Sequence, residues 1–513
     1  MRKQKTLRLI LGDQLNAQHS WFTSVDDAVT YVMMEVRTET DYAVHHVQKV
    51  IGFFAAMREF SKALENQGHT VIYMRINDEA NQHSFDKNLK QFIDQHHFTH
   101  FDYQLPDEYR VDECLNAFCQ TLHITSNVCD SEHFYCERFE LSEFFKGKKM
   151  LLMESFYRSM RTKHSVLMEG AKPFSGQWNY DENNRKKLPK NHKPTPPLTF
   201  HTDVSEIYSE LKTAGIRTIG TVDERNFLWP INRKESLQLL DFFVNECLQL
   251  FGTYQDAMMP NEWSLYHSRL SFSMNLKLIS PKEVIERAIE AWKQNPEKIE
   301  FNQLEGFVRQ IIGWREYMRG IYWKEMPSYS DLNYFNHRQK LPSWYWTGKT
   351  KMACMRDAID QSLNYAYAHH IQRLMITGNF ALLAGVHPDE VDAWYLGIYI
   401  DAIEWVEITN TRGMSQFADG GIVGTKPYVS SATYIDKMSH YCGSCYYSKS
   451  IKVGERACPF NSLYWNFYDQ HEDKLAKNPR IGMMYNVWRK MKPEDKTALL
   501  EQAQYYLEHI EEL

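Results

Sequence analysis

Four cysteines in the C-terminal third of the chain have types and spacings that suit a metal site. Cys442 and Cys445 are two residues apart, and Cys458 follows after twelve more, directly before a proline. Thiolates at Cys-x2-Cys spacing bind zinc or an iron–sulfur cluster, and a Cys-Pro pair often ends a cluster-binding run. The fourth ligand must come from a distant segment, where Cys354 is the candidate. Zinc, a cluster and a reduced thiol pair in a loop all fit this spacing.

The bulk composition narrows the class of protein. With 513 residues the chain is long enough for two or three domains and a large buried core. No apolar stretch reaches the roughly 20 residues that cross a bilayer, and the N-terminus does not resemble a secretion signal. Nine cysteines in such a chain indicate a reducing compartment. We therefore expect a cytoplasmic protein without disulfides and without contact to a membrane.

Charge is distributed unevenly along the chain. The net charge of −6 argues against a protein that coats nucleic acid with its whole surface. Residues 146–193, however, contain twelve Lys and Arg but only four acids, with aromatic residues between them. Such a segment could follow a phosphate backbone, and a solvated linker is the equally weighted alternative. The bases chosen as candidate DNA contacts are Arg158, Arg161, Lys163 and Lys186.

The hydrophobic pattern changes along the sequence. Period-2 stretches at residues 7–12, 31–36, 70–76, 100–106 and 123–129 predict strands, and helical patterns over 44–66 and 84–97 lie between them. After residue 236 only helix-length amphipathic segments remain. We predict an N-terminal α/β domain with a parallel, Rossmann-like sheet (1–138), a connector (139–235) and a large all-α domain (236–513).

The end of the first predicted strand is the expected place for a bound heterocycle. The G-x-G-x-x-G pattern is absent at Gly12, Asp13 and Gln14. This argues against a dinucleotide held by the usual fingerprint. Asp13 and Gln14 could still form hydrogen bonds to a planar ring, with Glu35 at the end of the next strand. A plain turn is the more common reason for such a sequence.

Adjacent histidines and nearby hydroxyls suggest chemistry in the helical domain. A helix predicted over 357–380 has Leu374 on its apolar face, and this phase turns His370 inward and places His369 about 100° away. Histidine titrates near neutral pH and suits acid–base work, although a single inward histidine is usually a core residue. Ser268 and Ser271 lie just before a helix, where they could seat a diphosphate or act as plain caps.

Taken in order, these segments resemble the cryptochrome/photolyase family, in particular its bacterial iron–sulfur branch, which includes prokaryotic (6-4) photolyases. The resemblance spans nearly the whole chain. Its most specific motifs are residues 9–16, 252–258, 267–271, 365–373 and 413–421, together with the four cysteines.

The resemblance implies a flavin in the helical domain. FAD is expected there in a folded conformation, and Glu407 stands where other branches often have Asn beside the reactive ring nitrogen. A carboxyl group at that position could manage a proton of the flavin. The residues implied to bind FAD are His267, Ser268, Leu270, Ser271, Trp314, Glu316, Asp401, Glu407 and Asn410.

The resemblance also implies light-driven repair of UV-damaged DNA. In a (6-4) photolyase, excited reduced FAD passes an electron to the flipped-out lesion while a histidine supplies a proton. His370 is implied as the main proton donor, His369 as its support and Tyr428 as their neighbour. The electron relay of this branch is matched by Trp394, Tyr395 and Trp346. This match reverses the ordinary interpretation of these rings as core residues.

Two further cofactors follow from the same resemblance. The branch carries 6,7-dimethyl-8-ribityllumazine as antenna, for which Gly12, Asp13, Gln14 and Glu35 are the candidate pocket, and a 4Fe-4S cluster on Cys354, Cys442, Cys445 and Cys458. A monomer is expected. Two other functions stay open: a blue-light photoreceptor of the same branch, and a flavin-free iron–sulfur protein that binds nucleic acid.

Overall fold

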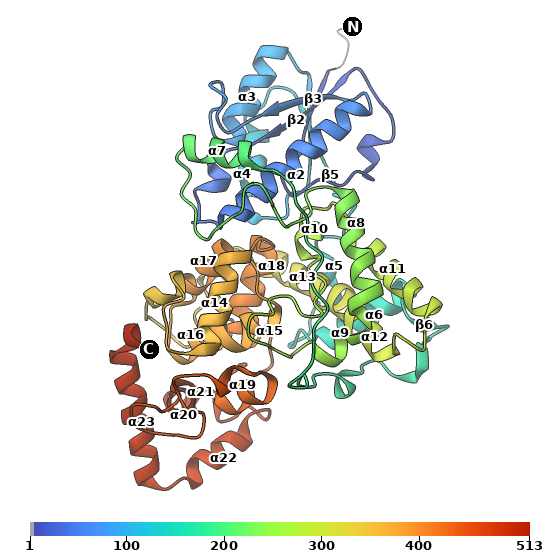
Figure 1. Cartoon of the computed structure of the whole chain (residues 1–513). Coiled ribbons are helices and arrows are strands. Elements are labelled where there is room, and N and C mark those ends of the chain that lie inside the picture. Colours follow the sequence, from blue (N-terminus) through green and yellow to red (C-terminus); the bar gives the residue numbers. More distant parts are fainter. Residues whose placement is uncertain (1–4) are drawn as a thin grey trace.

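A computed structural model describes residues 5–513. An α/β domain lies at one end, a helical body in the middle and the last helices of the chain at the other end (Figure 1). No helix in the described part of the chain is long and apolar enough to cross a membrane. The division into a parallel-sheet domain and a helix-rich body confirms the predicted fold class.

The N-terminal sheet has five parallel strands in the order β3-β2-β1-β4-β5. The order reverses between β1 and β4, so loops that leave these two strands in opposite directions open a crevice at their carboxyl ends. All five strands were predicted. The first four end two or three residues before their predicted ends, and the fifth ends at Cys129 as predicted. Their bounds are β1 (Thr6–Leu9), β2 (Val29–Met34), β3 (Thr70–Met74), β4 (His100–Gln104) and β5 (Thr125–Cys129).

Helices cover both faces of this sheet. Ile10, Tyr31 and Met33 pack against α2, whereas Leu9 and Val32 pack against α3 and α4. Side chains alternate between faces along a strand, which is why neighbouring residues serve different helices. The helices of this domain are α1 (Arg37–Thr40), α2 (Val47–Asn66), α3 (Phe85–His96) and α4 (Tyr109–Gln120).

The connector is ordered and returns to the first domain. Its helix α7 packs beside α2 through Ile207 and Leu211 (Figure 1). Earlier parts of the connector run along the helical body. Its elements are α5 (Glu140–Phe144), α6 (Met153–Lys163), β6 (Met168–Glu169), β7 (Lys172–Pro173) and α7 (Ser205–Thr213).

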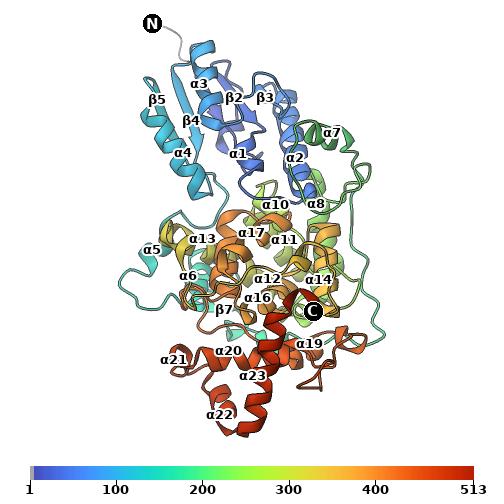
Figure 2. The same cartoon turned by 90° about the vertical axis from the view of Figure 1, so that its left-hand side faces the viewer.

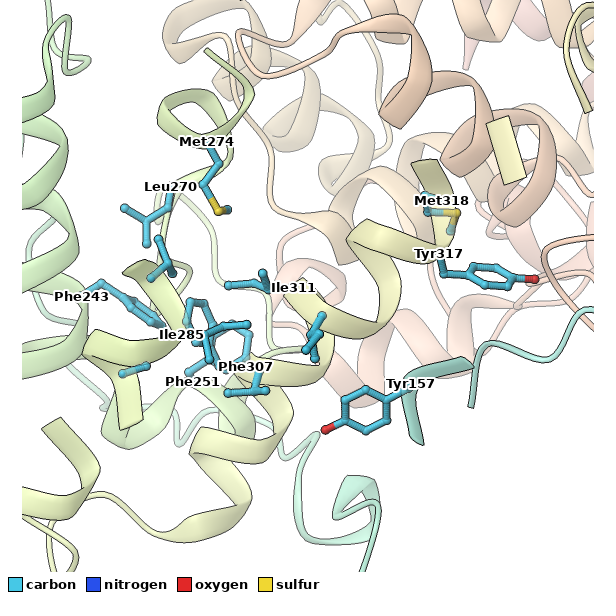
Figure 3. Packing of buried hydrophobic residues seen from close by; sticks show 14 of the residues in the cluster. Tyr157, Phe243, Phe251, Leu270, Met274, Ile285, Phe307, Ile311, Tyr317 and Met318 are labelled. Carbon is cyan, nitrogen blue, oxygen red and sulfur yellow. The ribbon is translucent and has the colours of Figure 1, made fainter. Parts of the chain in front are cut away.

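The helical body surrounds a large apolar core, part of which Figure 3 shows. The ring centroids of Phe243 and Phe307 are 4.5 Å apart, and that of Phe251 is 5.5 Å from Phe307. The α-helices are α8 (Arg233–Phe242), α9 (Leu248–Tyr254), α10 (Ser271–Asn275), α11 (Pro281–Gln294), α12 (Phe301–Val308), α13 (Glu316–Glu325), α14 (Ala353–Tyr365), α15 (His370–Gln372), α16 (Asn379–Leu383), α17 (Pro388–Ile398), α18 (Glu404–Ile408), α19 (Ala432–Met438), α20 (Pro459–Gln470), α21 (Glu472–Leu475), α22 (Gly482–Lys490) and α23 (Pro493–Glu508).

Tighter and wider turns interrupt these helices. Four segments are π-helical: Phe243–Cys247, Arg309–Arg315, Arg373–Gly378 and Thr409–Ser415. Such wide turns are rare and occur often at functional sites. Short 3-10 turns lie at Ser20–Phe22, Phe174–Gly176, Asp181–Asn183, Ser328–Asp331, Ser343–Trp346, Tyr441–Gly443 and Ile510–Glu512.

The helix predicted over residues 357–380 is broken, so the inference from its phase was wrong. α14 ends at Tyr365, Ala366 adopts a left-handed conformation with φ 52°, and a new helix starts at His370. His369, directly before α15, is extended, so the two helices do not share one phase. His369 is fully buried, whereas His370 is exposed.

A buried lysine joins the two domains. Lys277, beyond α10, donates through Nζ to Asp107 Oδ2 and to the Asp13 carbonyl, both at 2.6 Å. The Lys277 and Asp107 side chains are each 1% exposed. Burial opposes ionisation of Asp107, but the charges of Lys277 and Arg319 outweigh it and lower the pKa of this carboxyl group. Because Asp13 and Asp107 follow β1 and β4, the lysine fixes the open end of the sheet to the helical body.

Lys277→Ala should destabilise the protein by about 3–5 kcal/mol, because it leaves a buried carboxylate without its partner. Urea unfolding followed by circular dichroism would measure this loss in the first transition. Lys282→Ala, which removes an exposed lysine on α11, should change the stability by less than about 0.5 kcal/mol. Equal stabilities of the two variants would contradict the assigned role.

Candidate functional site

A cavity opens at the carboxyl ends of the central strands. Gly12 and Asp13 follow β1, Glu35 follows β2 and Asp107 follows β4, and all four line it. The reversal of strand order creates this crevice, as expected for a doubly wound sheet. Gln14 does not line the cavity. Its side chain accepts from the Leu11 N–H at 3.1 Å and donates to the Gln104 carbonyl at 3.3 Å, which closes the loop.

The cavity contains charged groups that the sequence analysis did not select. Lys49 and His45 enter it from α2 and the turn before α2. Lys49 Nζ lies 3.2 Å from His45 Nδ1 and donates to the Leu396 carbonyl at 2.8 Å. Burial lowers the pKa of Lys49 to about 8 and raises the pKa of Asp13 to about 6. An enclosed space with apolar walls and few convergent polar groups suits a planar heterocycle.

Glu35 touches the cavity, but its carboxylate is already engaged. It accepts from Arg58 Nε at 2.8 Å, from the Tyr73 hydroxyl at 2.8 Å and from the Ile76 N–H at 2.9 Å. These bonds hold β2, β3 and α2 together. Glu35 therefore shapes the wall and has little capacity left for a ligand.

Asp401 is the meeting point of three segments in the helical body. Its carboxylate accepts from Ser271 at the start of α10 and pairs with Arg373 at 3.0 Å. Its carbonyl accepts from Asn275 Nδ2 at 2.6 Å, and Asn275 in turn accepts from Arg315. Residues that are far apart in the sequence thus surround one buried carboxylate.

Buried polar atoms near this meeting point lack protein partners. Among the described residues, His267 Nε2, both ring nitrogens of His369 and Glu407 Oε1 form no hydrogen bond. The His267 and His369 rings are stacked, with centroids 4.4 Å apart and planes 8° apart. Orphaned buried groups are costly unless a ligand satisfies them, so this part of the body has the character of a binding site.

The histidines have lowered basicity. Burial lowers the pKa of His369 well below its usual value, and the neighbouring His267, His370 and Arg373 act in the same direction. Although part of the His370 ring is exposed, the protein around it lowers its pKa to about 4, assisted by the charges of Arg373 and Arg185. Both imidazoles are neutral at neutral pH in the free protein.

Glu407 belongs to a group of buried carboxyls. Burial raises the pKa of Glu407 well above its usual value, and the nearby Asp392 adds to this effect. Burial likewise raises the pKa of Asp392 to about 7, against the charge of Arg412, whose Nε lies 2.5 Å from Asp392 Oδ2. A carboxyl group with a raised pKa keeps its proton to higher pH and, once it has lost that proton, can accept one.

The remaining predicted flavin contacts differ in their surroundings. Leu270 is buried in the core below α10, and Ser268 Oγ accepts from the Leu270 N–H at 3.4 Å. Trp314 is partly buried beside Tyr317, and Asn410 donates to the Val406 carbonyl at 2.7 Å. Glu316 accepts from the Tyr135 and Cys136 N–H groups at 3.2 and 3.1 Å. Its carboxylate therefore holds the last segment of the N-terminal domain, just before the connector.

Two of the predicted relay residues form a continuous path of rings. The Tyr395 and Trp394 centroids are 5.2 Å apart, Trp394 is 5.2 Å from Tyr345, and Tyr345 stacks on Trp344 at 4.7 Å. Trp394 and Tyr345 are fully buried. Trp346 lies at the end of the same 3-10 turn and is 40% exposed. The sequence analysis selected Trp346 and missed Tyr345.

The four cysteines line one small cavity. All are free, and burial raises the pKa of Cys354 well above its usual value, with the other three thiols adding to the effect. Within residues 5–513, no group of three or more His, Cys, Asp or Glu side chains is arranged to hold a metal ion. The structure therefore brings together, from three separate segments, the four thiols that the sequence analysis selected.

One predicted DNA contact was wrong. Arg161 is fully buried and donates to the carbonyls of Val166 at 3.1 Å and Trp178 at 3.4 Å. It is a structural residue of the connector. Lys186 is exposed, whereas Arg158 pairs with Glu154 at 3.0 Å and Lys163 with Glu140 at 2.5 Å, each pair at the surface.

Tyr428 is partly buried and lies within reach of two cations. Burial raises the pKa of Tyr428, and the positive charges of Arg185 and Arg480 oppose this. Arg185 also influences His370, so the two predicted neighbours share a cation.

Comparison with known proteins identifies the family. The sequence is 41% identical over 508 residues to a (6-4) photolyase from Agrobacterium fabrum, which covers 98% of this chain and 99% of the relative. The chain belongs to the cryptochrome/photolyase family. Residues 8–227 also match the family model of deoxyribodipyrimidine photo-lyase-related proteins.

Solved photolyases and cryptochromes share the fold. A bacterial class III photolyase from Agrobacterium tumefaciens superimposes with a TM-score of 0.56 at 14% identity, covering 99% of this chain and 98% of the other. The cryptochrome of Synechocystis sp. PCC6803 gives 0.55 at 11% identity, with 97% and 95% covered. Both have the same order of an α/β domain and a helical body, as this family member does.

Several residues of this photolyase relative had no usable signal in the sequence. Lys49 lies on a regular amphipathic helix, where the sequence does not distinguish it from a surface lysine. Only the structure shows that its side chain is buried. Arg373 ends the 365–373 motif, and nothing in the sequence links it to its partner Asp401, 28 residues later. The run Trp344-Tyr345-Trp346 did offer a signal for Tyr345, because adjacent rings in one short turn are unusual outside a core.

Proposed function

We propose that this protein is a light-driven DNA repair enzyme, a (6-4) photolyase that reverses (6-4) pyrimidine–pyrimidone photoproducts. The main observation behind this proposal is the sequence similarity, over nearly the full length, to a bacterial (6-4) photolyase. The unpartnered His267 and His369 rings beside the exposed His370 support it, because this reaction class needs a proton transfer next to the lesion.

FAD fits the orphaned polar atoms around Asp401. When bound, reduced FAD supplies an electron to the lesion upon light absorption. Ser268, Ser271 and the start of α10 would hold its phosphates, and Arg373 with Asp401 would orient the ring system. Glu407, whose pKa burial raises well above its usual value, would hold a proton beside the ring. His267 and Asn410 complete this proposed contact set.

His370 would protonate the lesion after the damaged dinucleotide leaves the duplex. The exposed ring is open to such a base, whereas the buried His369 would support it from behind. The free imidazole is neutral, and a phosphate of the lesion nearby would raise its pKa. Protonation of His370 would thereby depend on bound damaged DNA.

His370→Ala should abolish repair while FAD binding and photoreduction persist. Loss of a (6-4) photoproduct from an oligonucleotide under blue light measures the repair. His123→Ala, which changes an exposed histidine of the N-terminal domain, should repair normally. Normal flavin photoreduction without any repair by the wild-type protein would instead favour a blue-light photoreceptor.

The pH dependence of repair tests whether His370 supplies the proton. Since the pKa of His370 is about 4 in the free protein, its protonated fraction falls as pH rises. Repair at low DNA concentration should decline by roughly tenfold per pH unit above this pKa, between pH 5 and 8. At saturating DNA concentration the repair rate should begin to fall only at a higher pH, because bound DNA raises the pKa of His370. A flat profile at low DNA concentration would exclude His370 as the acid.

The ring path Tyr395, Trp394 and Tyr345 would carry electrons to the flavin from the protein surface, where Trp346 is exposed. Trp394→Phe should slow light-driven reduction of the flavin in the presence of an external thiol, and flavin absorbance follows this directly. Trp465→Phe, which alters a ring stacked on Trp488, should have no effect. An unchanged rate in the Trp394 variant would contradict the relay.

The four cysteines would bind a 4Fe-4S cluster. About four irons and four sulfides per chain are expected, and Cys354→Ala should lose them, as measured by iron and sulfide assays. Cys247→Ala, a buried cysteine outside the cysteine cavity, should retain them. Zinc in the purified protein would refute the cluster.

The crevice of the N-terminal domain would hold 6,7-dimethyl-8-ribityllumazine as antenna. Asp13, Lys49 and His45 are its available polar groups. DNA would contact the exposed Lys186 of the connector, with Arg158 and Lys163 supplying further charge.

A further inference from the structure

A strongly basic segment lies among the C-terminal helices, outside the groups discussed so far. Residues 474–492 contain six Lys and Arg and no Asp or Glu, in a chain with a net charge of −6. The segment comprises the turn before α22, α22 itself and the turn into α23. Its bases are Lys474, Lys477, Arg480, Arg489, Lys490 and Lys492.

Four of these bases are free to meet an external anion. Lys474 donates to the Tyr334 carbonyl at 2.6 Å, and Arg489 pairs with Glu472 at 2.5 Å. The other four are exposed, and within residues 5–513 none of them has an ion-pair partner: Lys477, Arg480, Lys490 and Lys492. Such cations are wholly solvated, so a polyanion can engage them at little desolvation cost.

The helix that carries them is firmly held and presents one open face. Trp488 stacks on Trp465 with centroids 5.3 Å apart, and Tyr485 is buried. Met483, Val487 and Lys490 follow one another at i, i+4 and i+7 on the opposite face, with Met483 74% exposed. Figure 2 shows α22 at the far end of the molecule from the α/β domain.

The basic turn is joined to the segment that carries Tyr428. Asn478 Nδ2 donates to the Thr425 carbonyl at 2.9 Å, three residues before Tyr428. Arg480 on this turn and Arg185 on the connector both oppose the rise in the pKa of Tyr428. The segment that carries Tyr428 is thus held to the basic turn by a hydrogen bond.

We propose that the turn 477–481 and α22 bind the DNA phosphate backbone next to the lesion. This inference depends on the proposed function, because the duplex must present its damaged base to His370. A helix of nine residues is about 13 Å long, close to the rise of four phosphates along one strand. Free cations at both ends of α22 can thus contact the same strand.

The test uses the full-length protein with Lys477→Gln and Arg480→Gln combined. Binding to an undamaged duplex and to a duplex with one (6-4) photoproduct is measured in the dark at several salt concentrations. The slope of log Kd against log salt should shrink by about 2 for both duplexes, and their affinity ratio should stay constant. Phosphate contacts carry no lesion specificity, so both duplexes respond equally.

Lys87→Gln combined with Lys90→Gln is the matched control. These exposed lysines on α3 lie at the opposite end of the molecule (Figure 1), and the change in net charge is the same. The control should keep the wild-type slope. An equal decrease of the slope in both double variants would mean that net charge alone causes the effect. This result would overturn the proposal.

Two further outcomes separate this inference from the proposed function. If the wild-type protein repairs and binds DNA while the Lys477/Arg480 variant keeps the wild-type slope, the α22 surface is wrong and the repair function stands. If the wild-type protein binds neither duplex, the proposed function itself fails. Binding of vesicles with anionic lipid, lost in the variant while DNA binding is unchanged, would assign the surface to a membrane instead.

Discussion

The buried carboxylate of Asp401 is the contact on which the helical site depends. It lies where α10, the π-helical segment after α15 and the start of α18 converge, and it satisfies Ser271 and Arg373 together. A buried charge without partners costs several kcal/mol, so each of these segments has only one acceptable position relative to the others. The histidine pair is placed by the same constraint, because Arg373 also donates to the Ala368 carbonyl at 2.6 Å, directly before His369.

Part of this arrangement could be predicted from the sequence, and the reasons for the rest are physical. The strands and the polar loops that follow them were predictable, because residues at the carboxyl ends of parallel strands must meet at one edge. Cys442 and Cys445 were predictable from their spacing. The orientation of the histidines was not, since it depends on the left-handed residue Ala366, whose conformation nothing in its side chain demands. In the sequence, Arg161 resembled a surface base. In the structure it donates to three backbone carbonyls.

The lowered pKa of His369 and the raised pKa of Glu407 have one origin. Both result from loss of solvent, which disfavours the charged form of either group. A site of this kind holds few fixed charges of its own. Its protonation states then respond strongly to any charge that a ligand or a nucleic acid introduces, which is the property that a light-triggered proton transfer requires.

The helical site and the crevice of the α/β domain are joined by a short length of chain. Asp401 belongs to the helical site, whereas Ile403 lines the crevice of the α/β domain, and the Glu404 N–H donates to Glu108 Oε1 at 3.0 Å across the domain boundary. Lys277 fixes the same boundary through Asp107. Rigid docking by buried charges leaves little freedom for one domain to tilt against the other. The separation between a chromophore in the crevice and one beside Asp401 would therefore be set by packing, and energy passed between them would not vary with solvent-driven motion of the domains.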